Sequence, residues 1–138
     1  MNVLVYLQFL LNLFLLASAT VSGIRLVNGP NAATGRVEVK WDSYDYGTVC
    51  DDGFTNNDAK ITCIQASYTL PSGYASYYCC AKFGQGTGGI RWVLPKCAGT
   101  ETSLASCPTS YTPGVIVTNC GHNEDIGCLL YTSPSPRD

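Results

Sequence analysis

The clearest alternation of apolar and polar positions lies in residues 35–41, which read GRVEVKW. Successive side chains of a strand point to opposite faces, so this pattern predicts a strand with one buried face. Residues 46–50 (YGTVC) follow the polar turn at 42–45 and predict its antiparallel neighbour. The apolar run at 90–94 predicts a further strand after the glycine-rich turn at 83–89.

One segment has the pattern of a helix. Thr55 can cap its first turn, and Asp58 lies three residues further on, where its carboxylate can bond back to the chain. Small or apolar residues then recur at helical spacing, at Ala59, Cys63 and Ala66. The residues Pro-Ser-Gly at 71–73 end the segment, and a short helix fits at 102–106. Together these elements predict a small α+β domain.

The N-terminal residues have the pattern of a leader. Residues 3–16 form one apolar run, and the small residues Ala-Ser-Ala follow at 17–19. This pattern is typical of a secretory signal peptide, which we expect to span residues 1–23 with cleavage after Ala19 or after Gly23. The alternative is a membrane anchor, but a run of 14 residues is short for a span that needs about 20. No other apolar run has spanning length, so we expect a secreted or extracellular protein, or the ectodomain of a membrane protein.

The last residues, 128–138 (CLLYTSPSPRD), break with the preceding pattern. Back-translated, the string fits the end of a sequencing adapter read in frame, which predicts a non-native tail. The alternative is a short, disordered tail rich in serine and proline. On the first interpretation, the domain at 24–127 lacks its last residues.

Composition narrows the classes of function. The chain has 138 residues, a formal charge of −2 and 13% charged residues. This excludes a large multidomain enzyme and argues against a nucleic-acid binder that neutralises phosphates. Of the eight cysteines, seven lie within 24–127, and in a secreted domain they predict a disulfide framework. No C-x2-C pair accompanies the single histidine, His122, and no Ser/His/Asp or Cys/His constellation is evident, so we expect neither zinc nor catalysis.

Several motifs occur together and in order across 24–127. They are RLVNG at 25–29, GRVEV at 35–39, YGTVCDDGF at 46–54, FGQGTG at 83–88, CAGTE at 97–101, and CGHNEDIG at 120–127. With these motifs the chain resembles a scavenger receptor cysteine-rich (SRCR) domain. It is nearer to the six-cysteine group, since it lacks a cysteine near 28–34. The resemblance implies a small disulfide-rich fold in which a curved antiparallel sheet cradles one main helix.

The resemblance also implies disulfide bonds. It pairs Cys50 with Cys120, pairs Cys97 with Cys107, and joins Cys63 to a final cysteine about ten residues after Cys120. That cysteine is missing, and Cys128 is its only substitute in this sequence. The adjacent pair Cys79-Cys80 departs from the family pattern. A vicinal disulfide, a bond elsewhere in the chain and a bond to another chain all remain open.

Two acidic pairs come together if Cys50 and Cys120 are bonded. They are Asp51-Asp52 and Glu124-Asp125. Carboxylates packed together repel one another unless a cation lies among them, and oxygen ligands suit Ca²⁺ or Mg²⁺. The resemblance implies the same kind of site, so we expect Asp51, Asp52 and Glu124 to bind a divalent cation. Asp58 and Asn119 are weaker candidates. The alternative is that Asp52 and Asp125 cap turns on a solvated surface.

The expected function is ligand recognition outside the cell. We expect a module that binds proteins or polyanionic surfaces with the help of a divalent cation, and that is not an enzyme. Arg91 and Lys96, with Lys82, could contact a polyanion, although scattered solvated charges are the simpler interpretation. Two alternatives remain. The domain could be a non-catalytic part of a larger secreted or membrane-bound enzyme such as a protease, or it could be a small secreted disulfide-rich effector.

Overall fold

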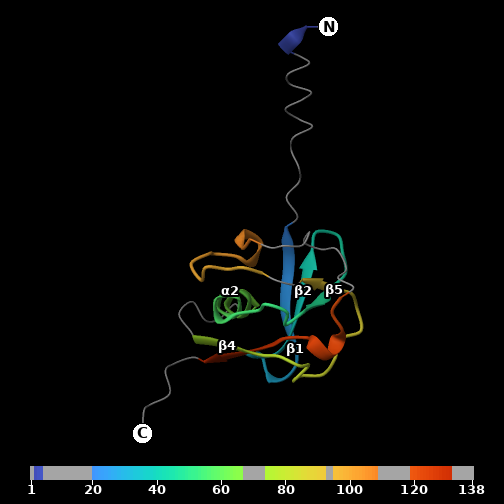
Figure 1. The fold of residues 1–138 in the computed structure, drawn as a ribbon, viewed down its shortest axis with the longest axis vertical. Helices are drawn as coiled ribbons and strands as arrows, with labels where there is room; N and C mark the ends of the chain where they lie inside the picture. The colour runs from blue at the N-terminus through green and yellow to red at the C-terminus, as the bar shows by residue number, and fades with distance from the viewer. Residues whose placement is uncertain (1, 5–19, 67–73, 93–94, 109–118, 132–138) are drawn as a thin grey trace.

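The computed structural model describes residues 2–4, 20–66, 74–92, 95–108 and 119–131 (Figure 1). Its strands are β1 (Val21–Asn31), β2 (Thr34–Trp41), β3 (Gly47–Val49), β4 (Tyr74–Tyr78), β5 (Ile90–Trp92) and β6 (Gly127–Tyr131). Its helices are α2 (Asn56–Ala66) and two short 3-10 turns, η1 (Leu104–Ser106) and η2 (His122–Glu124). The strands form one sheet in the order β4-β6-β2-β3-β5. The remaining strand, β1, also pairs with β2 but lies outside this order.

Strand β2 is the centre of the sheet, because it pairs with β1, β3 and β6. Its alternation places Val37, Val39 and Trp41 in the core, each with no exposed surface. The α+β fold with a curved sheet and one main helix is therefore confirmed. The sheet is mixed, since β3 and β5 run parallel while the other pairs are antiparallel.

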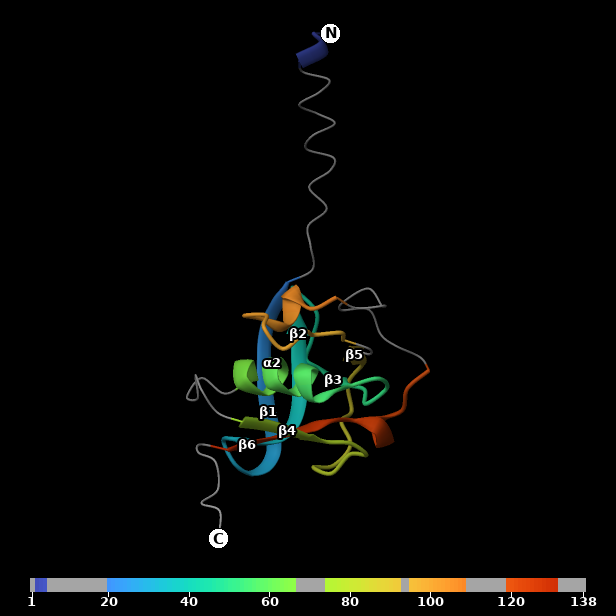
Figure 2. The same ribbon diagram turned by 60° about the vertical axis from the view of Figure 1, so that its left-hand side comes forward.

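Helix α2 crosses in front of β1 and β2 in Figure 2, and in Figure 1 it is seen nearly end-on beside β1. It begins after Thr55, whose backbone N–H donates to Asp58 Oδ2 at 2.7 Å. The Asp58 N–H faces the Thr55 hydroxyl at 3.4 Å in return. This reciprocal cap is the one that the sequence predicts. The helix buries Ala59, Ile61 and Cys63 against the sheet.

The polar face of β2 is also largely covered. Glu38 accepts hydrogen bonds from Arg25 on β1 and from Arg36, at 2.7 Å each from Nη2. The other terminal nitrogen of Arg36 lies 3.0 Å from the carbonyl oxygen of Gly84 and also faces those of Phe83 and Gln85. Arg36 thereby fixes the glycine-rich turn against the sheet.

Strand β1 begins two residues after Ala19. Val21 pairs with Trp41, and the Thr20 backbone N–H donates to the carboxylate of Asp42 at 3.0 Å. Cleavage of the predicted leader after Ala19 would leave β1 whole, whereas cleavage after Gly23 would remove its first residues. Most of the predicted leader lies outside the described residues. None of the described helices is long and apolar enough to cross a membrane.

Residues 128–131 belong to the sheet, although they follow the expected domain boundary at residue 127. They lie in β6, which pairs with β2 on one edge and β4 on the other. Cys128 and Leu130 point to the core and are 0% and 6% exposed. The sequence did not predict this strand, because it is stabilised mainly by pairing with strands that are distant in the chain. Whether the string from residue 128 onward is native stays a prediction, and residues 132–138 lie outside the described part of the chain.

All eight cysteines are paired in the structure. Disulfides join Cys50 to Cys120 and Cys97 to Cys107, the pairs that the resemblance implies. Cys63 is bonded to Cys128, the substitute partner in this sequence. Cys79 and Cys80 are bonded to each other, which was one of three open alternatives.

Candidate functional site

The acidic residues near Cys50 and Cys120 are positioned by the backbone. Besides the disulfide, the Asp51 N–H donates to the carbonyl oxygen of Glu124 at 3.0 Å. The Ile126 N–H donates to the carbonyl oxygen of Val49 at 2.9 Å, so the two segments run side by side. As a result, Asp51 and Asp52 lie next to Glu124 although they are about 70 residues apart in the sequence. We call these three residues the acidic cluster.

The carboxylates of the acidic cluster are close enough to repel one another. One oxygen each of Asp52 and Glu124 lies within 4.8 Å of the other and of the bonded sulfurs of Cys50 and Cys120. Partial burial raises the pKa of Asp51 above its ordinary value, and the charges of Glu124 and Asp52 raise it further. Hydrogen bonds from the backbone N–H groups of Cys80 and of Asp51 itself oppose this rise in pKa.

The donor set of the acidic cluster is of the kind that hard divalent cations prefer. The bonded sulfurs offer no thiolate, so the available ligands are carboxylate oxygens, which suit Ca²⁺ and Mg²⁺. Glu124 uses one oxygen to accept the Gly121 N–H at 2.7 Å, which orients the side chain and leaves its other oxygen available. All three acidic side chains are partly exposed, so water could complete the coordination of a cation.

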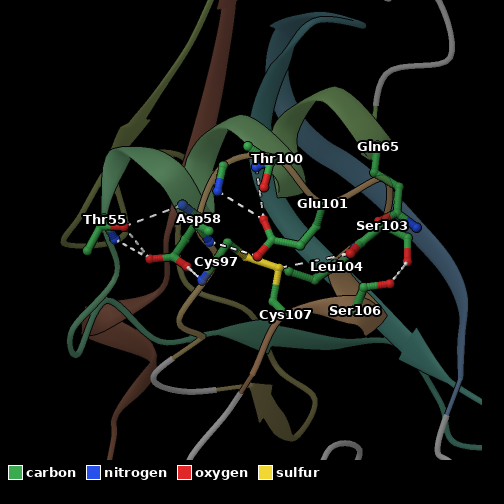
Figure 3. The surroundings of a disulfide bond; sticks show 12 residues. Thr55, Asp58, Gln65, Cys97, Thr100, Glu101, Ser103, Leu104, Ser106 and Cys107 are labelled. Atoms are coloured by element: carbon green, nitrogen blue, oxygen red, sulfur yellow. Dashed lines mark hydrogen bonds between the residues drawn. A yellow bond between two sulfur atoms is a disulfide. The ribbon is translucent and has the colours of Figure 1, made fainter.

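Asp58, a weaker candidate ligand, is not grouped with the carboxylates of the acidic cluster. It is completely buried. Its Oδ2 accepts hydrogen bonds from the backbone and hydroxyl of Thr55, and its Oδ1 accepts the Cys97 N–H at 2.7 Å (Figure 3). With both oxygens engaged, Asp58 joins the start of α2 to the Cys97–Cys107 loop. Asn119 is exposed next to Cys120, and its part in a cation site stays a prediction.

Asp125 also has a structural role, but it is buried and does not cap a turn on a solvated surface. Its buried carboxylate accepts the Gly86 N–H at 2.7 Å and lies 3.0 Å from His122 Nδ1. The other ring nitrogen of His122 lies 2.8 Å from the carbonyl oxygen of Gly88. The two side chains therefore hold the glycine-rich turn beside the acidic cluster.

The three cationic side chains that could contact a polyanion are those of Arg91, Lys82 and Lys96, and each has a different neighbour. The Arg91 guanidinium lies 5.0 Å from the centre of the Tyr44 ring, and Lys82 Nζ lies 5.3 Å from that of Tyr78. Lys96 is exposed and lines a surface hollow at the start of α2.

Sequence reasoning missed a second group of cations around Tyr46. The Arg25 guanidinium lies 4.0 Å and Lys40 Nζ 5.9 Å from the centre of this ring. Arg25 and Lys40 come from neighbouring strands, β1 and β2, so only the register of that pair brings them together. No short motif in the sequence carries this information.

Sequence reasoning also missed a contact between the acidic cluster and the vicinal disulfide. Cys80 Sγ lies 3.9 Å from Asp51 Oδ2. The two residues are 29 positions apart, and the backbone of the intervening turn decides their approach. The Ala81 N–H donates to the carbonyl oxygen of Asp125 at 2.9 Å, which draws this turn toward the acidic cluster.

Comparison with known families and proteins gives consistent matches. The family model described as "Scavenger receptor cysteine-rich domain" matches residues 27–129. A scavenger receptor cysteine-rich domain superfamily protein of Patiria pectinifera is 41% identical over 119 residues, 82% of this chain and 10% of that protein. Galectin-3-binding protein of Rattus norvegicus is 38% identical over 127 residues, 89% of this chain and 21% of that protein. The chain thus spans about a tenth to a fifth of the length of these relatives.

Solved structures match as well. The third SRCR domain of murine neurotrypsin is 40% identical, with a TM-score of 0.64, and the match covers 77% of this chain and 92% of that one. The SRCR domain of mouse MARCO, in its dimeric form, is 34% identical with a TM-score of 0.58, covering 78% of this chain and 93% of that one. At these identities the likeness extends to sequence as well as fold.

Proposed function

Because this chain belongs to the scavenger receptor cysteine-rich family, an extracellular module, we propose that it recognises anionic ligands through a divalent cation. The observation that carries the proposal is the acidic cluster. Asp52 and Glu124 converge from two segments at the Cys50–Cys120 disulfide, and the pKa of the neighbouring Asp51 is raised by burial and by the charges of these two residues. Such an arrangement costs free energy that a bound cation would offset.

The cation would be held by carboxylate oxygens of Asp51, Asp52 and Glu124. Bound there, Ca²⁺ or Mg²⁺ would supply positive charge to which an anionic group of a ligand can coordinate. The chain's own residues orient this site: the Gly121 N–H holds Glu124, and the Asp51–Glu124 backbone hydrogen bond fixes the distance between the two segments.

Direct contacts to an anionic ligand would come from cationic side chains. Arg91 is our first candidate, because its guanidinium is held against Tyr44, and Lys96 is the second, because it is exposed at the hollow beside α2. The ligand class that follows is an acidic protein surface or a polyanion.

Binding of a sulfated dextran to the immobilised chain tests this proposal. We expect binding in Ca²⁺ that is lost in EDTA, and lost equally in the Asp51→Asn, Asp52→Asn double variant. Asp45→Asn is the matched control, because Asp45 is exposed and lies outside the acidic cluster. Binding that is the same in Ca²⁺ and in EDTA would refute the role of the cation.

The contribution of the cationic residues is tested separately. The Arg91→Ala, Lys96→Ala double variant should weaken dextran binding and reduce its dependence on salt, because fewer charges meet the polyanion. Its Ca²⁺ affinity should stay unchanged. An unchanged affinity for dextran would remove both residues from the ligand-binding surface.

A further inference from the structure

The vicinal disulfide Cys79–Cys80 is the most accessible one in the structure. Both of its cysteines are exposed, directly after β4. Each of the other three disulfides has at least one fully or almost fully buried cysteine, namely Cys50, Cys63, Cys97, Cys107 and Cys128. A disulfide is opened by direct attack of a thiolate on sulfur, so access decides which bond reacts first.

Opening this bond would add very little conformational freedom to the unfolded chain. It joins adjacent residues, whereas the Cys50–Cys120 and Cys63–Cys128 bonds close loops of 70 and 65 residues. The entropic stabilisation by a disulfide grows with the length of the loop that it closes. Reduction of the vicinal bond should therefore leave the fold intact.

Other contacts hold the turn that carries the pair. The Ala81 N–H donates to the Asp125 carbonyl oxygen at 2.9 Å, and the Gly84 N–H donates to that of Ala81 at 2.8 Å. The rings of Tyr78 and Phe83 also pack edge to face, 6.0 Å apart. None of these contacts involves the sulfur atoms, so the path of the turn does not depend on the S–S bond.

A carboxylate lies beside the two sulfurs. One oxygen of Asp51 and the sulfurs of Cys79 and Cys80 all lie within 4.8 Å of one another. As a disulfide, the pair offers no thiolate to a metal. As two thiolates with one carboxylate, it offers the donor set that thiophilic divalent cations such as Zn²⁺ and Cd²⁺ prefer.

We propose that Cys79, Cys80 and Asp51 form a redox-gated site for a thiophilic divalent cation. A dithiol reductant opens the site. One reductant thiolate attacks a sulfur of the pair and forms a mixed disulfide with it. The second reductant thiolate then attacks this mixed disulfide and releases the cysteine. The reductant leaves as a cyclic disulfide, while Cys79 and Cys80 gain two electrons and two protons. The metal then replaces the two thiol protons. Asp51 also belongs to the acidic cluster, so this site is tested in the absence of Ca²⁺ and Mg²⁺.

The test begins with limited reduction of the folded, secreted chain by one equivalent of dithiothreitol. Alkylation and peptide mapping should find two new thiols, at Cys79 and Cys80. Titration with Cd²⁺ should then produce the ultraviolet sulfur-to-cadmium absorption with one ion per chain, and the untreated chain should produce none. Opening of another disulfide first, or the lack of this absorption after reduction, would overturn the proposal.

Variants separate the three ligands. The Cys79→Ser, Cys80→Ser double variant should melt like the oxidised wild type and bind no Cd²⁺ after the same treatment. In the reduced Asp51→Asn variant, Cd²⁺ affinity should fall about tenfold or more, while the matched control Asp45→Asn keeps the affinity of the wild type. Undiminished affinity in Asp51→Asn would remove the carboxylate from the site.

Discussion

Replacement of Asp58 by alanine tests the account of how the helix and the disulfide loop are joined. Asp58 is fully buried, and its two oxygens accept hydrogen bonds from Thr55 and from the Cys97 N–H. Loss of a helix cap costs about 0.5–2 kcal/mol. A buried N–H left without an acceptor costs about 1–3 kcal/mol. We therefore expect Asp58→Ala to lower the free energy of unfolding by about 3 kcal/mol.

The assay is urea unfolding of the oxidised domain, followed by circular dichroism. Asp58→Asn is the informative second variant. Its carbonyl oxygen can still accept the Cys97 N–H, but its NH₂ group would face the Thr55 N–H, so we expect a smaller loss than in Asp58→Ala. Asp45→Ala, an exposed carboxylate, should change stability by less than about 0.5 kcal/mol. A loss below about 1 kcal/mol in Asp58→Ala, close to that control, would refute the reasoning.

Three further perturbations have defined outcomes. Replacing Cys63 and Cys128 together by alanine should lower the free energy of unfolding by about 2–5 kcal/mol, and an unchanged urea midpoint would show that this bond is not formed in the secreted chain. Asp51→Asn should stabilise the cation-free domain at pH 7, because a raised pKa means that ionising Asp51 destabilises the fold. This gain should vanish at pH 3, below the ordinary pKa of aspartate, about 3.9, and a loss of stability at pH 7 would contradict it. Glu38→Gln should destabilise the domain at pH 7: burial raises the pKa of Glu38, but the bonds and charges of Arg36 and Arg25 lower it more. That difference from the wild type should shrink as the pH falls below about 4, and a difference that does not depend on pH would count against the ion pairs.

Local pattern predicted the elements whose signals are local. The alternation in β2 and the Thr55–Asp58 cap of α2 are set by neighbouring residues, and the structure has both. The resemblance to a family implied the fold, including the curved sheet. Strands β1, β4 and β6 were not predicted from the local pattern. Of these, β4 and β6 are stabilised mainly by pairing with distant partners.

The candidate site shows the same division. Asp51, Asp52 and Glu124 could be grouped from the sequence because the resemblance implied a bond between their neighbours Cys50 and Cys120. The sequence could not exclude Asp58, because a carboxylate in a capping box and one that binds a metal have the same local pattern. Only the position of the Cys97 N–H, 2.7 Å from Asp58 Oδ1, shows that this side chain is already engaged.

The contact between Cys80 and Asp51 had no signal in the sequence. It depends on the path of the turn after β4, which the backbone hydrogen bond from Ala81 to Asp125 fixes. Cross-strand neighbours such as Arg25 and Lys40 depend in the same way on strand register.

Calorimetric titration of the cation-free domain with Ca²⁺ tests the central claim most directly. We expect one ion to bind per domain in the wild type and in the Asp45→Asn control. Binding should be lost in the Asp51→Asn, Asp52→Asn double variant. It should also weaken as the pH falls, because protons compete with Ca²⁺ for the carboxylate of Asp51, whose pKa is raised. A wild-type domain that binds no Ca²⁺ or Mg²⁺, or a double variant that binds as tightly as the wild type, would contradict the account.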